Sequence, residues 1–366
     1  MRKLLPLVLA LATLVSNAQD LFEVKGLCIA APNSDGVTEF VKFMDEELGP
    51  NGINTLVLRV DFNYAYESRP ELRGNNPLSK AQIKQLVAVA KKYQINLIPQ
   101  VNLLGHQSWA EKTNKLLEVY PQFDETPQII IPNKYEWPNA DGLYCKSYCP
   151  LHPEVHDVVF DLVDEIVAVF EATAFHAGMD EVFYIAHEKC PRCQGKDPAT
   201  LFANEVNKIS RHLAHNNKRL WIWGDRLIDA STSGIGMWEA SMNNTARAVD
   251  LIDRSVVISD WHYEKALPTP AMFALKGLDV IACPWKKPEV AKEQVKMMYN
   301  FKENATPEMK EHYLGIMHTV WSSANEFIKS YHSQKAKEIN PTTQEDCFRA
   351  MLAAIKELEG AAQISN

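Results

Sequence analysis

The stretch Phe175-His176-Ala177-Gly178-Met179-Asp180-Glu181-Val182 predicts a buried β-strand that ends in two acids. Because side chains alternate along a strand, His176, Gly178 and Asp180 share one face, and the apolar residues share the other. Glu181 follows where the strand ends. Two neighbouring carboxylates raise the pKa of one of them, which keeps one acid protonated near neutral pH, as a general acid requires. The small Gly178 and the inward-facing His176 favour this interpretation over a solvated acidic pair that caps the next helix.

Short apolar runs of this kind alternate with helical patterns along the chain. The expected strands are residues 26–30, 54–61, 95–102, the stretch quoted above, 220–225, 256–261, 279–285 and 313–321. The expected helices are residues 37–47, 79–93, 155–171, 198–215, 266–275, 288–299 and 323–331. Ser79 and Gln82 form a capping-box pattern at the start of the second helix.

About eight strands alternating with helices predict an α/β fold, a single-domain (β/α)8 TIM barrel. The alternative is an open doubly wound sheet, which usually carries a glycine-rich phosphate loop after its first strand. Ala31-Pro32-Asn33 follows the first expected strand here, and this sequence does not suit a phosphate loop.

The N-terminus has the pattern of a secretory signal peptide. A basic start, Met1-Arg2-Lys3, is followed by the apolar residues 4–15 and by the small residues Ser16-Asn17-Ala18. The apolar run is too short to span a bilayer. We therefore expect residues 1–18 to be removed and the protein to be exported, either to a periplasm or out of the cell.

The expected barrel occupies residues 19–335, and residues 336–366 are expected to hold a C-terminal helix packed on the barrel or trailing it. That helix is expected over residues 340–359, with Thr343 as a possible N-cap and Gly360 as its stop. The formal net charge is −8 and the chain has no basic block, which argues against nucleic acid or an anionic membrane as partner. No later stretch is long and apolar enough to span a membrane, and the pattern leaves the oligomeric state open.

Polar and aromatic residues gather where the expected strands end. In a TIM barrel the C-terminal strand ends form the active site, so these residues are the candidate site. Indole rings stack on the apolar face of a pyranose and carboxylates bind its hydroxyls, so the set suits a sugar. Some of the tryptophans could instead be core residues. Besides Asp180 and Glu181, the candidates are His106, His176, Trp223, Asp225, Trp261, Tyr263, Trp285 and Trp321.

Over roughly residues 22–330 the chain resembles the catalytic domain of glycoside hydrolase family 20, the β-N-acetylhexosaminidases. The strand ending His176-Ala177-Gly178-Met179-Asp180-Glu181 resembles the family signature, and the segment 98–106 resembles the family's third strand. The later tryptophans, with Asp225, match those that wall the family's sugar pocket. Lys25 stands where the family usually has arginine, and the family's tyrosine near the seventh strand is absent, so Tyr263 is a candidate substitute.

The resemblance implies a retaining mechanism in which the substrate's own 2-acetamido oxygen attacks C1. Asp180 would orient the acetamido group, and Glu181 would protonate the leaving oxygen and then activate water. The implied reaction removes β-linked N-acetylhexosamine from a glycan, and it needs no metal and no organic cofactor. Two alternatives remain open. The barrel could be an inactive sugar-binding protein, or it could be a metal-dependent hydrolase with His106, His176 and Asp180 as ligands.

Seven cysteines include two close pairs, Cys145 with Cys149 and Cys190 with Cys193. In an exported chain such pairs favour disulfides or free thiols, although the spacing also fits a zinc site, to which His152 could contribute. The other three, Cys28, Cys283 and Cys347, are expected to be small core residues.

Overall fold

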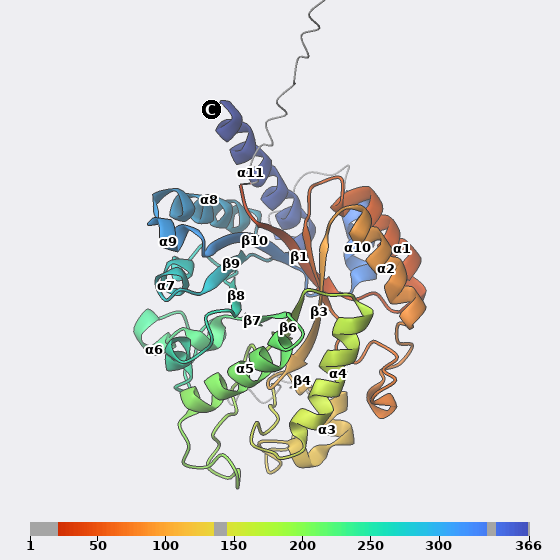
Figure 1. Ribbon diagram of the computed structural model, residues 1–366, viewed down its shortest axis with the longest axis vertical. Coiled ribbons are helices and arrows are strands. Elements are labelled where there is room, and N and C mark those ends of the chain that lie inside the picture. Colours follow the sequence, from red (N-terminus) through yellow and green to blue (C-terminus); the bar gives the residue numbers. More distant parts are fainter. Residues whose placement is uncertain (1–20, 135–144, 335–341, 365–366) are drawn as a thin grey trace, which may run out of the picture.

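The computed structural model describes residues 21–134, 145–334 and 342–364, and its centre is a closed barrel of eight parallel strands (Figure 1). Around the barrel the strands follow the order β1, β10, β9, β8, β7, β6, β3, β2. Their bounds are β1 (Val24–Ala30), β2 (Thr55–Arg59), β3 (Asn96–Leu103), β6 (Ala174–Gly178), β7 (Arg219–Trp223), β8 (Val257–Trp261), β9 (Asp279–Cys283) and β10 (Tyr313–Thr319). All eight predicted strands are present, so the predicted (β/α)8 TIM barrel is confirmed. The predicted signal peptide, residues 1–18, lies outside the described residues.

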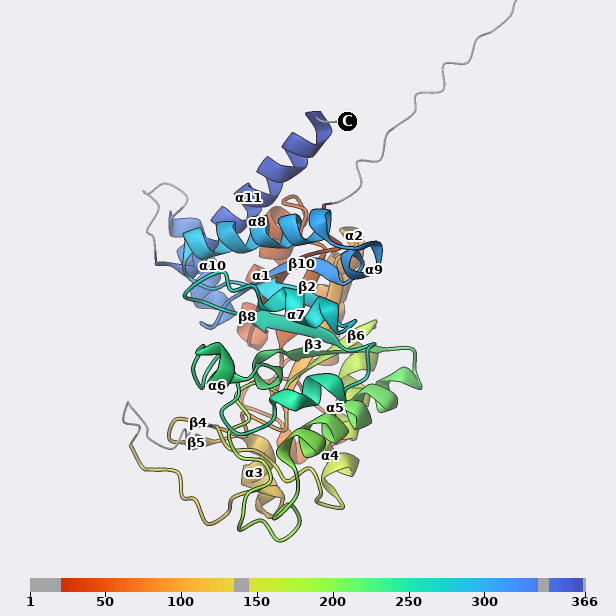
Figure 2. The same ribbon diagram turned by 90° about the vertical axis from the view of Figure 1, so that its left-hand side faces the viewer.

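Helices surround the barrel and connect its strands, as Figures 1 and 2 show from two directions. The predicted helices are observed as α1 (Val37–Phe43), α2 (Lys80–Lys92), α4 (Val155–Val169), α5 (Pro198–Ala214), α7 (Thr269–Leu275), α8 (Pro288–Asn304), α10 (Ala324–Gln334) and α11 (Gln344–Ile364). The capping box at the start of α2 is confirmed. Ser79 Oγ accepts the backbone N–H of Gln82, and the Gln82 side chain accepts the backbone N–H of Ser79.

Several short elements lie between these helices and strands, and the sequence pattern did not predict them. A small antiparallel hairpin, β4 (Ser108–Trp109) with β5 (Lys112–Thr113), follows β3. The short α-helices are α3 (Lys115–Val119), α6 (Ala230–Ser233) and α9 (Pro307–Lys310). One π-helical turn (Met44–Leu48) extends α1, and the 3-10 turns are Ser34–Gly36, Pro70–Leu72, Pro121–Phe123, Asp225–Leu227 and Ala246–Asp250.

Two apolar cores hold the fold together. The outer core lies between the strands and the helices and contains Phe175, Ala177 and Met179, so the predicted apolar face of β6 is confirmed. His176, on the opposite face, is fully buried. The inner core fills the barrel with side chains from its strands. Its buried members are Val24, Cys28, Val57, Ile98, Ala174, Trp221, Trp223, Val257, Trp261, Ile281, Cys283, Leu314 and Met317.

The C-terminal helix α11 packs along α8 and then projects beyond the barrel (Figure 2). The hydroxyl of Thr343 accepts the backbone N–H of Asp346, so the predicted N-cap is confirmed. The predicted stop at Gly360 is wrong, because α11 continues through this residue to Ile364 and a glycine lowers helix stability without forbidding the helix. Among the described residues, no helix combines the length and the apolar composition that crossing a bilayer requires.

Candidate active site

A cavity of about 610 Å³ opens at the C-terminal ends of the strands. This is the end at which TIM barrels carry their active sites. Most of its wall is aromatic or charged. The lining residues are Arg59, Asp61, Asn102, His106, Trp109, Asn114, Asp180, Glu181, Trp238, Glu239, Trp261, Tyr263, Glu264, Trp285 and Trp321. Seven of the ten residues predicted for the site are therefore in the wall of one cavity.

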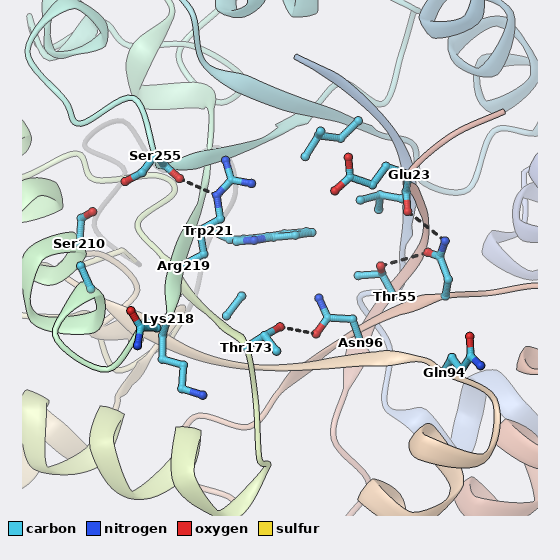
Figure 3. A pocket seen from close by; sticks show the side chains of 16 residues that line it. Glu23, Thr55, Gln94, Asn96, Thr173, Ser210, Lys218, Arg219, Trp221 and Ser255 are labelled. Carbon is cyan, nitrogen blue, oxygen red and sulfur yellow. Dashed lines mark hydrogen bonds between the residues drawn. The ribbon is translucent and has the colours of Figure 1, made fainter. Parts of the chain in front are cut away.

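A second cavity, of about 690 Å³, lies at the opposite end of the barrel, where the strands begin (Figure 3). The indole of Trp221 extends into it, and the residues around it, such as Thr55, Asn96 and Arg219, stand at or near the first position of their strands. In a TIM barrel this end contributes stability rather than chemistry. We therefore place the candidate active site in the cavity that contains Asp180 and Glu181.

The two acids meet at the imidazole of His106. His106 Nε2 lies 3.1 Å from Asp180 Oδ2 and 3.3 Å from Glu181 Oε2. Asp180 and Glu181 are both mostly buried, with 10% and 13% of their side-chain surface exposed. Asp180 Oδ1 is also buried, and no other described residue donates a hydrogen bond to it. A buried carboxylate oxygen without a donor is costly, so this atom is suited to accept an N–H group from a ligand.

The contact between His106 and Asp180 determines the charge of both side chains. Burial by itself would lower the pKa of His106, but the charge of Asp180 and the hydrogen bonds of the ring raise this pKa well above its usual value. Burial opposes the charge on Asp180, yet His106 lowers the pKa of the Asp180 carboxyl below its usual range. The two groups therefore form an imidazolium–carboxylate pair at neutral pH.

The backbone at the end of β6 turns sharply and presents both acids to the cavity. Gly178, Met179 and Glu181 have φ angles of +66°, +67° and +48°, so the regular strand ends at Gly178 rather than at the predicted Asp180. A side chain at Gly178 would come within 2.2 Å of Asn102 Oδ1, and one at Gly105 within 2.6 Å of the Asp180 carbonyl oxygen. Left-handed conformations at non-glycine residues cluster at functional sites, because the surrounding structure must hold them in place.

Three predicted site residues lie behind the cavity wall instead of in it. Asp225 is almost fully buried, and its carboxylate accepts hydrogen bonds from Glu181 N (2.9 Å), Arg226 Nε (2.7 Å) and Trp261 Nε1 (3.2 Å). Burial raises the pKa of Asp225 to about 6, and these donors keep the group ionised at neutral pH. Asp225 therefore positions the Glu181 backbone and the Trp261 ring.

His176 and Trp223 are both fully buried. His176 Nδ1 accepts the backbone N–H of Gly178 at 3.0 Å, which supports the turn that carries the acids. The ring of Trp223 packs against His176, at a centroid distance of 4.7 Å, and beneath Trp321, at 5.8 Å. The expectation that these two side chains reach a sugar is therefore corrected to a supporting position, because both point into the barrel below the level of the cavity.

The remaining predicted aromatic residues form one continuous wall. Trp261 packs on Tyr263 and Tyr263 on Trp285, with ring centroids 4.9 and 5.2 Å apart. Trp321, the most exposed of the four at 36%, donates its indole N–H to the Tyr263 hydroxyl at 2.8 Å. The Tyr263 oxygen accepts this bond, so its own hydrogen can be donated either to the neighbouring Thr319 hydroxyl or to a ligand. The wall thus offers apolar faces and one hydroxyl donor.

The structure adds three residues that the sequence did not assign to the sugar site. The Arg59 guanidinium lies 4.6 Å from the centre of the Trp321 ring and donates to the Val320 carbonyl. Glu239 accepts hydrogen bonds from the Tyr263 backbone and from His262. The Cys145 thiol donates to Glu181 Oε2 at 3.3 Å and lies 3.7 Å from His106 Nδ1. Lys25, at the family's arginine position, pairs instead with Glu359 of α11.

The ligand set proposed for a metal-dependent hydrolase is not assembled. His106 and Asp180 are in contact, but His176 binds backbone beneath them, and burial lowers its pKa to about 3. Within the described chain, the group of possible metal ligands at this cavity is His106, Cys145 and Glu181.

All seven cysteines are free and buried. The core positions predicted for Cys28, Cys283 and Cys347 are confirmed. Cys145 and Cys149, which the sequence suggested as a pair, are separated. Cys145 lies beside Glu181, whereas Cys149 lies beside Cys190 and Cys193.

Known proteins resemble this chain in sequence and in fold. A beta-hexosaminidase from Porphyromonas gingivalis is 27% identical over 180 residues, which are 46% of this chain and 22% of that protein. A lacto-N-biosidase from Bifidobacterium bifidum is 21% identical over 220 residues, 57% of this chain and 18% of that protein. The chain thus covers about a fifth of the length of these relatives.

Solved structures give the same fold over almost the whole chain. A beta-N-acetylhexosaminidase crystal structure superposes with a TM-score of 0.63 at 16% identity, covering 93% of this chain and 76% of that one. The structure of the Flavobacterium johnsoniae chitobiase superposes with a TM-score of 0.61 at 15% identity, covering 93% of this chain and 51% of that one. The family model for the glycosyl hydrolase family 20 catalytic domain matches residues 63–336. With its paired acids in an aromatic cavity of the family's barrel, this chain belongs to glycosyl hydrolase family 20.

Proposed function

We propose that this protein is a retaining glycosidase that releases β-linked N-acetylhexosamine with help from the substrate's own acetamido group. The observation that carries the proposal is Asp180. One of its carboxylate oxygens is held by His106, and the other is buried beside the cavity and has no hydrogen-bond partner among the described residues. An acetamido N–H is a donor of the kind this oxygen lacks. Binding that N–H would turn the acetamido carbonyl oxygen towards C1, and a fixed orientation of this kind lowers the barrier for ring closure.

Asp180 would also stabilise the positive charge that develops on the acetamido group as its oxygen attacks C1. It enters the reaction already ionised, because His106 lowers its pKa. His106 therefore positions Asp180 and balances its charge. The Tyr263 hydroxyl, which accepts a bond from Trp321, has a hydrogen to donate to the acetamido carbonyl oxygen.

Glu181 would transfer the proton. Its carboxyl would protonate the leaving oxygen as the bond to C1 breaks, and would then remove a proton from the water that opens the cyclic intermediate. The contacts of its backbone N–H with Asp225 and of its Oε2 with Cys145 fix the position of this side chain. The aromatic wall from Trp261 to Trp321 would stack on the sugar ring.

The test compares a sugar with and without the acetamido group. We expect the wild-type protein to cleave 4-nitrophenyl N-acetyl-β-hexosaminides and to leave 4-nitrophenyl β-hexosides intact. Asp180→Asn should lose most of this turnover, because an amide cannot balance the developing charge. Equal cleavage of both substrates would exclude substrate assistance. Tight binding of the amino sugar without turnover by the wild-type protein would show an inactive sugar-binding barrel instead.

Glu181→Gln tests the proton donor. General acid catalysis contributes on the order of 10² to 10⁴ in rate, so turnover of diacetylchitobiose should fall by about this factor. The 4-nitrophenyl substrate should lose less, since its leaving group departs without a proton. Glu308→Gln, an exposed acid on α9, is the matched control and should keep full activity. A Glu181→Gln variant with normal turnover of both substrates would remove Glu181 from the reaction.

The N-terminal sequence supports export as a second part of the proposal, through its basic start, apolar run and small residues before Gln19. N-terminal sequencing of protein made in its native host would be expected to start at Gln19. Recovery of full-length protein that keeps Met1 in the cytoplasm would contradict export.

A further inference from the structure

Three cysteine thiols gather in a buried group outside the active site. Cys149 lies in the connection between β3 and α4, and Cys190 and Cys193 lie in the connection between β6 and α5. Cys149 Sγ is 3.4 Å from Cys193 Sγ and 3.6 Å from Cys190 Sγ. Each of the three residues is at most 1% exposed. The chain therefore folds three soft ligand atoms into contact with one another, away from solvent.

A carboxylate completes the group. One carboxylate oxygen of Glu125 and the three sulfur atoms all lie within 4.8 Å of one another. Glu125 is fully buried, and its Oε1 accepts the backbone N–H of His187 at 3.0 Å. Its Oε2 is buried, and the thiols of Cys190 and Cys193 are its polar neighbours. A buried carboxylate needs a cation or several donors to offset its desolvation, and the ion pairs of the described chain do not include Glu125.

The separations fit one tetrahedral ion. Zinc binds thiolate sulfur at about 2.3 Å, so two sulfurs of a tetrahedral site lie about 3.8 Å apart. The observed separations of 3.4 and 3.6 Å are close to this value. A disulfide would join two of the three thiols and leave the buried charge of the Glu125 carboxylate without a cation. A single cation satisfies all four groups.

The local backbone also suits thiolate ligands. Cys190-Pro191-Arg192-Cys193 forms a tight turn in which the backbone N–H groups of Arg192 and Cys193 face the Cys190 sulfur. The backbone N–H of Leu151 faces the Cys149 sulfur in the same way. Such N–H groups stabilise the negative charge of a sulfur ligand. His152, the histidine considered from the sequence, is not in the group, because its Nδ1 accepts the Glu154 N–H and its ring packs on Phe123.

We propose that Glu125, Cys149, Cys190 and Cys193 bind one structural Zn²⁺ ion. Binding would release the thiol protons of the three cysteines and leave four protein ligands around the metal. Four protein ligands leave no open position for water or substrate, which is the arrangement of a structural site. None of the four residues lines the active-site cavity, so the ion takes no part in the glycosidase chemistry.

The site would join the two connections that carry the catalytic groups. His106 and Cys145 belong to the connection that contains Glu125 and Cys149, and Glu181 belongs to the one that contains Cys190 and Cys193. Without the ion, polar contacts already join these connections. His187 N–H donates to Glu125 Oε1 at 3.0 Å, and Gln128 Nε2 lies 3.3 Å from His187 Nδ1. A bound ion would hold the two connections together and thereby fix the distance between His106 and Glu181.

The first test is the metal content of the wild-type protein. After purification in a reducing buffer containing Zn²⁺ and removal of free metal, elemental analysis should find about one zinc per chain. The intact mass of the denatured, non-reduced protein should show no loss of hydrogen from the cysteines. A folded protein with less than about a tenth of an equivalent of zinc, or with a disulfide within the group, would overturn the proposal.

The second test locates the ion with Co²⁺. Cobalt in this site should give a thiolate-to-metal charge-transfer band and the intense visible bands of tetrahedral coordination. Cys193→Ser removes one of three thiolates, so its charge-transfer band should lose about a third of its intensity or disappear with the metal. Glu125→Gln should keep the charge-transfer band and shift the visible bands.

Two control variants separate this site from other cysteines. Cys347→Ser alters a buried thiol elsewhere in the core, and Cys145→Ser alters the thiol of the active site. Both should keep one zinc per chain and an unchanged cobalt spectrum. Loss of the metal in Cys145→Ser, with retention in Cys193→Ser, would assign the ion to the His106–Cys145–Glu181 group and overturn the proposal.

Discussion

The Cys145 thiol donates a hydrogen bond to Glu181 Oε2 at 3.3 Å, although the two residues are 36 positions apart in the sequence. Burial raises the pKa of Cys145 to about 12, so the group remains a thiol and therefore a donor at neutral pH. The same sulfur lies beside His106 Nδ1. Cys145 thus links Glu181, the proposed proton donor, to His106, which holds Asp180.

Replacing this donor should slow the reaction. A hydrogen bond contributes about 1 kcal/mol, so Cys145→Ala should reduce kcat about fivefold. Cys145→Ser, which keeps a donor of similar size, should retain most of the wild-type kcat. Steady-state kinetics on diacetylchitobiose measures both. Equal kcat values for the alanine variant and the wild type would show that the thiol does not position Glu181.

The exposed position of Trp321 predicts a binding defect without loss of the fold. Trp321→Ala removes an apolar face from the cavity wall, which should weaken binding of an N-acetylhexosamine thiazoline by about 1–3 kcal/mol. The Tm should change little, since 36% of this residue is already exposed. Calorimetric titration with the thiazoline measures the affinity. An unchanged affinity in the folded variant would remove Trp321 from the sugar site.

Trp223 should behave in the opposite way. Its side chain is fully buried beneath Trp321, and truncating a buried aromatic residue costs about 3–5 kcal/mol of stability. Trp223→Ala should therefore lower the free energy of unfolding by about this amount in urea titrations. A stable Trp223→Ala protein with greatly weakened thiazoline binding would instead place this ring in contact with the sugar.

The His262 cluster predicts how stability depends on pH. His262 is buried between Asp260, at 3.2 Å, and Glu239, at 2.8 Å. Burial alone would lower its pKa, but the two carboxylates raise it to about 10. Since the folded pKa lies above the unfolded value near 6.5, protonated His262 stabilises the fold fully below pH 6.5, and this contribution is lost as the pH rises towards 10.

The comparison of wild type with His262→Gln isolates this contribution. The difference in their free energies of unfolding should be largest near pH 6 and should shrink steadily up to pH 10. Urea titrations at several pH values provide the measurement. A difference that stays constant over this range would mean that His262 is not charged in the folded protein.

Gln344 of α11 lies outside the barrel, and its contacts with the aromatic wall predict that replacing it weakens binding of the thiazoline. Its side-chain oxygen accepts the indole N–H of Trp285 at 3.2 Å and the backbone N–H of Trp321 at 3.3 Å. Gln344→Ala should weaken thiazoline binding about fivefold, on the basis of about 1 kcal/mol for a hydrogen bond. Glu357→Ala, an exposed change on the same helix, is the control and should bind normally. Identical affinities for both variants would contradict the coupling.

The strands and their facing side chains could be predicted because they follow from local periodicity. The alternation from Phe175 to Asp180 showed which residues face inward, and the order of the strands placed Asp180 and Glu181 at the mouth of the barrel. Periodicity does not give depth along the barrel axis. Trp223 and Trp261 both point inward, yet Trp223 is in the core and Trp261 lines the cavity.

The residues that the sequence did not reveal depend on contacts between distant segments. Cys145 and Glu239 lie on long connections without a repeating pattern, and only the folded chain brings them to Glu181 and Tyr263. The same is true of Glu125. The cysteines could be recognised from their close spacing in the sequence, but a single glutamate has no such pattern, and only the fold brings it to the thiols. Arg59 is the last residue of a strand that the sequence did predict. Its position at a C-terminal strand end could have marked it as a candidate site residue.

The contact of Gln344 with the aromatic wall extends the candidate site of this chain beyond the barrel. The family match stops at residue 336, before the helix that bears Gln344 begins. An alignment restricted to the shared barrel therefore does not include Gln344. Evolution could adjust sugar preference by altering an appendage while every barrel residue stayed the same. Grafting the strands and their loops into another protein would transfer the acids but remove the acceptor of the Trp285 indole and of the Trp321 backbone N–H.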